Sequence, residues 1–178
     1  ALALLVSDAL VIAHGQRGFH VTPISLEDFH DITENRVLLE TEALRQSIAV
    51  GDDDWESAVL AAFHRLGKAE QRLAADPEAR FEEWEQRNRE FHRELIRACP
   101  SRWRHHFLGI LYQQAERYRR LTVTRKPIAR DLHDEHQRIL DATLARDADL
   151  ACSLLASHIR LTYEAVAKLP PELFTPSA

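Results

Sequence analysis

Apolar residues recur every three or four positions along most of the chain, which is the spacing of a helix that buries one face. Phe29, Ile32, Leu39 and Ala43 form one such stripe. The chain has only five glycines and seven prolines, so long stretches contain no helix breaker. The breaks leave short links, which favour antiparallel neighbours. The pattern predicts an all-α antiparallel bundle of about six helices, over residues 26–49, 53–74, 79–98, 101–122, 127–146 and 148–168.

The first 22 residues show a different pattern. Residues 1–9 resemble the last turns of a helix, and residues 10–21 predict a β-hairpin with a glycine-containing turn. Ser25 and Asp28 then form a capping box that begins the first long helix. We expect three parts, which are an N-terminal unit at 1–22, a helical domain at 25–169 and an extended, proline-rich tail at 170–178.

The composition is that of a soluble globular protein with one sizeable core, because 178 residues include 45% hydrophobic and 29% charged ones. No apolar run approaches the ~20 residues that a membrane span requires. The two cysteines, Cys99 and Cys152, form no disulfide framework, which favours a reducing, cytoplasmic compartment. The formal net charge of −5 argues against a strongly basic nucleic-acid binder. Any DNA contact is therefore local or lies outside this chain.

Four residues in the helical segments form a candidate metal site. Asn88 and His92 are four residues apart, so on a helix their side chains lie one turn apart on the same face. His136 and His158 fall on or near the apolar faces of two later helices, which a bundle would bring close. Imidazole nitrogens with an amide oxygen suit divalent zinc, nickel, cobalt, manganese or iron. A lone histidine is more often an ordinary residue, and His133 could take the place of His136.

Arg36 lies on the same apolar stripe as Phe29 and Ile32, which places a guanidinium among core residues. A buried charge needs a partner. One interpretation is an internal salt bridge to Glu40, one turn further on. The other is a clamp for a carboxylate ligand beside the metal, because the planar fork of arginine suits a carboxylate. The basic residues from Arg117 to Lys126 are expected to face solvent, although one of them could turn into the same pocket.

Several segments, in this order and spacing, resemble a family of bacterial transcription regulators. The stretch LVSDALVIAHGQRGFHVTPIS is similar to the last helical turns and the wing of a winged helix-turn-helix domain. ENRVLLETEALR is similar to the first helix of an FCD effector domain, and NREFHREL and DEHQRILDATLARDADLACSLLASHI to its histidine helices. The resemblance is to the FadR subfamily of the GntR superfamily, and it covers nearly the whole chain.

The resemblance implies a ligand-responsive transcription regulator of the repressor type, whose intact form works as a homodimer on a two-fold DNA site. It implies that Arg36 contacts a small organic-acid effector. Arg17, at the expected tip of the wing, is the candidate DNA contact of this chain. The implied cofactor is a divalent metal ion, zinc, nickel or manganese, with the ligands Asn88, His92, His136 and His158.

Two departures from the family pattern change the expectation. Many members carry aspartate where Asn88 stands, and a neutral amide gives the site one negative charge fewer. This weakens metal binding and favours an anionic effector that completes the metal shell. The chain also contains no methionine and begins late in the winged helix, so that mainly the wing with Arg17 is present. We therefore expect residues 1–178 to sense the effector and not to read a DNA sequence on their own.

Other protein classes stay open from the residues alone. A metal-dependent enzyme acting on a small carboxylate needs a base beside the ion, and Glu135 is expected on a different helix face from its neighbour His136. A ferritin-like di-iron protein needs two Glu-x-x-His pairs, and only Glu27 and His30 have that spacing. The third alternative is a structural helical dimerisation module with an empty site.

Overall fold

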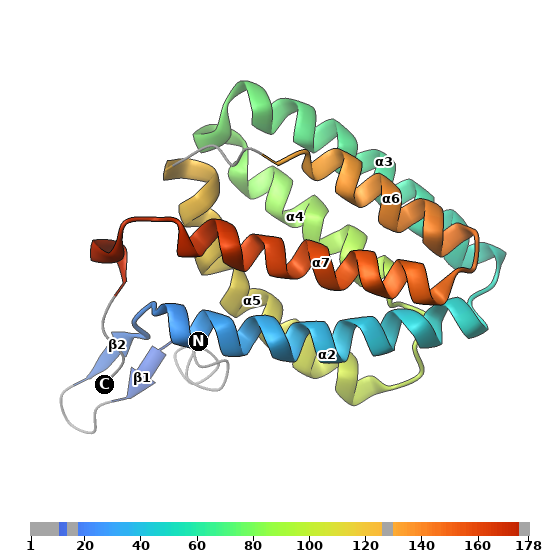
Figure 1. Ribbon diagram of the computed structural model, residues 1–178, viewed down its shortest axis with the longest axis horizontal. Helices are drawn as coiled ribbons and strands as arrows, with labels where there is room; N and C mark the ends of the chain where they lie inside the picture. Colours follow the sequence, from blue (N-terminus) through green and yellow to red (C-terminus); the bar gives the residue numbers. More distant parts are fainter. Residues whose placement is uncertain (1–10, 14–17, 126–129, 175–178) are drawn as a thin grey trace.

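The predicted six-helix bundle is confirmed by the computed structural model, which describes residues 11–13, 18–125 and 130–174 (Figure 1). A β-hairpin precedes the helices and a short 3-10 helix follows them. The elements are β1 (Val11–Ala13), β2 (Phe19–Val21), α2 (Leu26–Val50), α3 (Asp53–Ala75), α4 (Pro77–Leu95), α5 (Arg102–Arg125), α6 (Leu132–Leu144), α7 (Ala148–Ala167) and η2 (Pro171–Leu173).

Polar side chains cap the first turn of all six helices. In each case the side chain before the helix accepts a hydrogen bond from the backbone N–H three residues further on, and these residues are Ser25, Asp52, Asp76, Ser101, Asp131 and Asp147. These contacts satisfy N–H groups that the first turn of a helix leaves unpaired. Short acidic or serine-containing links are therefore sufficient to start each helix.

Two helices begin two or more residues away from their predicted first residue. The sequence predicts that the fifth helix starts at residue 127, but this helix, α6, begins at Leu132, because Asp131 provides its cap. Residues 126–129 lie outside the described part of the chain. The predicted helix at 79–98 begins earlier, at Pro77, since proline at the first helical position loses no intrahelical hydrogen bond. It also ends earlier, at Leu95.

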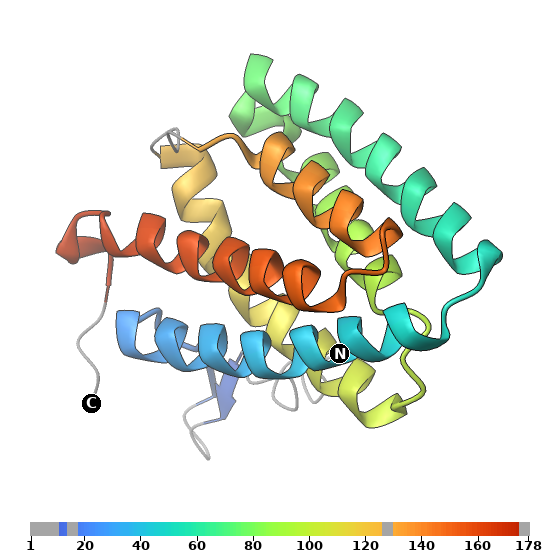
Figure 2. The ribbon, with the colours of Figure 1, turned by 45° about the vertical axis from the view of Figure 1, so that its right-hand side comes forward.

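The six helices form a closed ring (Figure 1, Figure 2). Around the ring, α2 packs on α7, α7 on α6, α6 on α3, α3 on α4, α4 on α5, and α5 on α2. The pairs α3/α4 and α6/α7 are antiparallel neighbours, as the short links predict. The pair α2/α3 differs, because extended backbone at Gly51 and Asp52 turns the chain and α2 lies along α7 and α5. A side chain directed to the axis of this ring can meet groups from all six helices.

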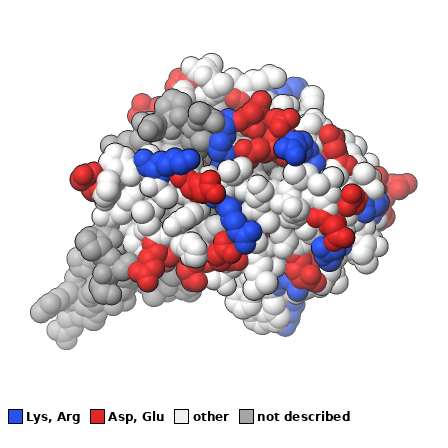
Figure 3. Space-filling model, in the orientation of Figure 1, with Lys and Arg blue, Asp and Glu red and all other residues white. Residues whose placement is uncertain are grey.

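The predicted N-terminal hairpin is confirmed by the antiparallel pairing of β1 with β2, in which Val11 lies opposite Val21. Its turn, with Arg17, and the helix expected at residues 1–9 lie outside the described part, so the DNA contact of Arg17 stays a prediction. None of the helices that are described is long and apolar enough to cross a membrane. On the face shown in Figure 3, basic and acidic side chains of the described residues lie interspersed.

The main hydrophobic core fills the ring with large side chains such as Trp55 and Phe91, which are almost completely buried. The centre is not apolar throughout, because Glu40, His92 and His136 are buried to the same degree. Burying such groups costs free energy unless each finds a hydrogen-bond or charge partner. Their contacts therefore define the candidate site.

Candidate metal centre

Three helices each place one histidine at the axis of the ring. On α4, Trp84, Asn88 and His92 follow one another at intervals of one turn and face the interior. α6 contributes His136 and α7 contributes His158. The three histidines are 1%, 0% and 7% exposed, in sequence order, and one ring nitrogen of each lies within 4.8 Å of the others. The fold thus brings together the three histidines that the sequence singles out.

Each of these histidines contacts a carboxylate on a different helix through its Nδ1 atom. Such partners hold an imidazole in one orientation and one tautomer, and are typical of histidines that bind a metal through the other nitrogen. The contacts, between Nδ1 and a carboxylate oxygen, are His92 to Glu40 of α2 at 2.6 Å, His136 to Glu70 of α3 at 2.8 Å, and His158 to Glu135 of α6 at 2.7 Å.

The three carboxylates are ionised, so they accept these hydrogen bonds. Burial raises the pKa of the Glu40 carboxyl, but the charge of Arg36 and the surrounding donors outweigh burial and hold the pKa at about 2. Burial likewise raises the pKa of Glu135, and hydrogen bonds, one of them from Arg130, lower it to about 2. The pKa of Glu70 is also lowered, because its histidine partners outweigh burial. A carboxylate without a proton can only accept, so the Nδ1 atoms carry the hydrogens.

The imidazoles of His92 and His158 favour the neutral form. Burial lowers the pKa of His92 and moves the pKa of His158 well below its ordinary value. A neutral imidazole carries one hydrogen. Because that hydrogen is on Nδ1, the Nε2 atom keeps the lone pair that a metal ion needs.

The residues present fit a divalent ion. His136 Nε2 is buried and has no hydrogen-bond partner among the described residues, which costs about 1–3 kcal/mol for an unsatisfied polar atom. A bound cation would remove that cost. Asn88 is buried beside His92, and an amide oxygen with three imidazoles is a donor set that zinc and related ions accept. His133 lies outside the cluster, because it is half exposed and its Nδ1 contacts Glu70 at 2.7 Å.

Arg36 makes the salt bridge that is one of its two interpretations from sequence. Its Nη2 lies 3.0 Å from Glu40 Oε2, and its guanidinium lies over the Tyr112 ring, 4.2 Å from the centroid. The Tyr112 hydroxyl donates to Glu40 Oε1 at 2.9 Å. Glu40 therefore joins Arg36, Tyr112 and His92 in one buried network. The Nε of Arg36 is buried without a hydrogen-bond partner in the described part of the chain.

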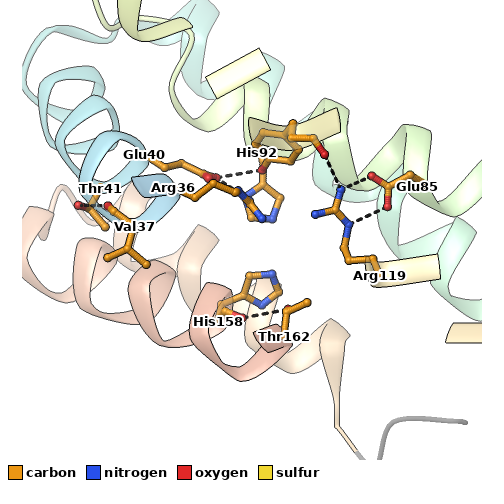
Figure 4. A network of polar contacts seen from close by, with 10 residues as sticks. Arg36, Val37, Glu40, Thr41, Glu85, His92, Arg119, His158 and Thr162 are labelled. Carbon is orange, nitrogen blue, oxygen red and sulfur yellow. Dashed lines mark hydrogen bonds and ion pairs between the residues drawn. The ribbon is translucent and has the colours of Figure 1, made fainter. Parts of the chain in front are cut away.

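Arg119 is the residue of the basic run that turns inward (Figure 4). Its Nε lies 2.9 Å from Glu85 Oε2, and its Nη2 contacts the other oxygen of Glu85. Its third nitrogen, Nη1, is directed toward His92 and away from Glu85 (Figure 4). In this view Arg36 and Arg119 lie on opposite sides of the histidines.

A small cavity of about 20 Å³ lies among these groups. A space of this size holds an ion or one or two water molecules, and it is too small for an organic acid. Leu132 also lines an outer hollow of about 870 Å³, beside α3, and so separates the two spaces. The residues that line the small cavity are Arg36, Trp84, Asn88, His92, Arg119, Leu132, His158, Ile159 and Thr162.

The sequence does not reveal the acids that hold the histidines. Glu135 is expected on a different helix face from His136, and in the structure it contacts His158 on the neighbouring helix instead. The sequence does not indicate this contact, because the expectation considers one helix at a time. The burial of Glu40 could have been predicted from the sequence, since Glu40 lies one turn after Arg36 on the buried stripe. Glu85 likewise shares the inward face of α4.

The chain has relatives among transcription regulators. Residues 31–161 match the FCD domain family. The chain is 49% identical over 166 residues to the "uncharacterized HTH-type transcriptional regulator BphR" of Paraburkholderia xenovorans strain LB400, covering 93% of this chain and 68% of BphR. It is 35% identical over 163 residues to the "HTH-type transcriptional repressor GlaR" of Escherichia coli K12, covering 89% of this chain and 73% of GlaR.

Solved structures of regulators share the fold. "E. coli McbR/YncC" superposes with a TM-score of 0.80 at 16% identity, over 94% of this chain and 81% of that one. A GntR family regulator from Pseudomonas syringae pv. tomato DC3000 superposes with a TM-score of 0.67 at 23% identity, over 94% of this chain and 67% of that one. At these identities the likeness shows the architecture of the bundle.

The buried network around Glu40 leads to a stability prediction. Glu40→Gln removes the charge that balances Arg36, and a buried ion left without its partner costs about 3–5 kcal/mol. Urea denaturation followed by circular dichroism should show a loss of free energy of unfolding in that range. Glu34→Gln is the matched control, because Glu34 also lies on α2 and pairs with an arginine, Arg160, but on the surface. That change should cost at most about 1 kcal/mol, and equal losses in the two variants would contradict this account.

Proposed function

Because the chain belongs to the FCD domain family of GntR-type transcription regulators, we propose that its helical bundle binds a divalent metal ion and senses a small organic acid. The chain is a regulator of this type, and the ligands are inferred from the centre of the ring. The observation that carries the proposal is the convergence of three buried histidines, each with its Nδ1 atom hydrogen-bonded to a carboxylate. That arrangement directs three free nitrogen lone pairs to one place.

His92, His136 and His158 would supply nitrogen ligands, and Asn88 an amide oxygen. Zinc, nickel and manganese are the candidate ions, since each accepts this mixture of donors. When bound, the ion supplies a positive centre with open positions at which a carboxylate can coordinate. Glu40, Glu70 and Glu135 keep the rings oriented. Because these three acids already accept hydrogen bonds from the histidines, the regulator is favoured over the enzyme alternative.

Removing one ligand tests the metal proposal. His92→Ala deletes one of only four protein ligands, so the metal content of the purified protein should fall from near one ion per chain by at least tenfold. Elemental analysis measures this directly. His133→Ala is the control, because His133 shares Glu70 with His136 but lies outside the cluster, and it should keep its metal. Unchanged metal in His92→Ala, or equal losses in both variants, would contradict the assignment.

The acid would bind at the open positions of the ion and be held by Arg36. The Nε of Arg36 is buried beside the histidines and has no hydrogen-bond partner within residues 11–13, 18–125 and 130–174, and the planar fork of Arg36 suits a carboxylate. The present cavity admits no more than a small group, so binding an acid requires its lining to move. Leu132, at the first position of α6, lines both the cavity and the outer hollow, so a movement of its side chain would join the two spaces. Ligand binding therefore selects a second arrangement of the bundle.

A movement of the residues that line the cavity can reach the hairpin through α5. The link between β2 and α2 is held to α5, because Arg117 donates to the carbonyl oxygen of Thr22 and the Tyr118 hydroxyl accepts from the backbone N–H of Ser25 at 3.3 Å. Arg119, in the cavity, is the next residue on α5. A shift of α5 on ligand binding would thus reposition the hairpin that resembles the wing. The intact regulator would be a cytoplasmic homodimeric repressor in which two winged helices, each ending in a unit like residues 1–22, read two half-sites.

The acid should stabilise the protein, since any ligand of the native state does so by mass action. In a thermal-shift screen of small organic acids with zinc-loaded protein, at least one acid should raise the melting temperature by several degrees at a hundredfold excess over its Kd. Arg36→Lys keeps a positive charge beside Glu40 but lacks the fork, so its shift should be much smaller.

Sedimentation of the intact regulator with operator DNA extends the same test. Two protomers should bind one operator, and the acid that raises the melting temperature should change the bound fraction for wild type but not for Arg36→Lys. A single bound protomer would contradict the homodimer. An equal response of wild type and Arg36→Lys would contradict the clamp.

A further inference from the structure

We propose that Arg130 is a positioning residue for the metal centre, which acts through Glu135 to hold His158 in the orientation that a metal ligand needs. This inference rests on the proposed function, because it concerns one of the three histidines of that site. Arg130 lies just before α6, and its side chain is only 10% exposed. It would not touch the ion itself, so its effect must pass through the groups that it holds.

Arg130 forms a fork on the carboxylate of Glu135. Its Nε donates to Glu135 Oε1 at 2.9 Å, and its Nη2 donates to Oε2. The same Oε2 lies 2.7 Å from His158 Nδ1. Two parallel donors fix both the position and the plane of a carboxylate. Because the Glu135 side chain is 18% exposed, it would be free to turn toward solvent without this fork.

Arg130 also holds the backbone from which the His158 side chain extends. Its Nη2 donates to the carbonyl oxygen of His158 at 3.2 Å, and its Nη1 donates to Thr162 Oγ1 at 3.1 Å. The Thr162 hydroxyl donates to the same carbonyl oxygen at 3.3 Å (Figure 4). The main chain of His158 and the acid at its Nδ1 are therefore fixed by one guanidinium. This keeps the imidazole beside those of His92 and His136, whose ring centroids lie 5.3 and 4.6 Å away.

The other two orienting acids are held in different ways. Glu40 is completely buried and is held by groups at the axis of the ring. Glu70 is held between two histidines. Arg130 lies further out, where it lines the outer hollow. Loss of Arg130 should therefore disturb one ligand of the metal, His158, and leave the other two histidines in place.

Zinc affinity, measured by competition with a chromophoric chelator, tests the proposal. Arg130→Gln removes the fork and should weaken zinc binding about 10–100-fold, which is the usual effect of losing the outer partner of a metal ligand. Arg160→Gln is the matched control, because Arg160 forms the same kind of fork with Glu34, between α7 and α2 on the surface. The control should keep the wild-type zinc affinity.

A double-mutant cycle separates positioning from a general loss of stability. In protein that already carries His158→Ala, Arg130→Gln should change zinc affinity by no more than about twofold, because the ligand that Arg130 positions is gone. X-ray absorption of Arg130→Gln at saturating zinc should show one imidazole fewer than wild type. A merely structural role for Arg130 would change neither the number of imidazoles nor the dependence on His158.

A second variant guards against a folding defect in Arg130→Gln. Arg130→Lys keeps a cation beside Glu135 but replaces the fork by a single nitrogen, so it should still bind zinc more weakly than wild type, with the urea midpoint measured alongside. Wild-type zinc affinity in both Arg130 variants, or the same weakening with and without His158, would overturn the positioning role and leave the proposed metal site standing. Absence of zinc binding by the wild type would instead overturn the proposed function.

Discussion

The structure depends on hydrogen bonds between buried histidines and carboxylates that belong to different helices. Glu40 joins α2 to α4, Glu70 joins α3 to α6, and Glu135 joins α6 to α7. Tyr112 adds α5 to the first of these pairs. Every helix of the ring is thus connected at its axis by a polar contact. The ring must close for these groups to be satisfied, because a charge left alone in the interior is costly.

Such a centre does not maximise stability. Well-packed apolar residues in place of buried ion pairs are often neutral or stabilising, so the network around Glu40 and the pair of Arg119 with Glu85 are not explained by folding alone. Three of the buried atoms that have no hydrogen-bond partner among the described residues, Arg36 Nε, Trp84 Nε1 and His136 Nε2, belong to the cavity lining or to the histidine cluster. Their grouping favours a ligand that completes the hydrogen bonds. Because all six helices contribute groups at the axis, a ligand bound there would change how the helices pack against one another.

The architecture and the histidines could be predicted from sequence because both are local signals. Apolar spacing, caps and short links predict the helices, and the four-residue interval predicts that Asn88 and His92 share a face. The carboxylate partners could not be predicted, since the contact of His136 with Glu70 joins positions 66 residues apart and depends on how α3 and α6 pack. Trp84 matches the pattern of an ordinary core residue. Only the fold shows that its N–H has no partner in the part of the chain that is described, and that Arg119 is an arginine that turns inward.

The proposed metal site requires that the three histidines bind one ion through their Nε2 atoms. X-ray absorption spectroscopy of the purified protein reports the number and type of atoms around a bound metal. We expect a shell with the scattering pattern of three imidazoles together with oxygen, and no sulfur, although Cys99 and Cys152 are free thiols. A shell with sulfur, a shell with fewer than two imidazoles, or a protein that carries no metal after zinc loading would contradict it.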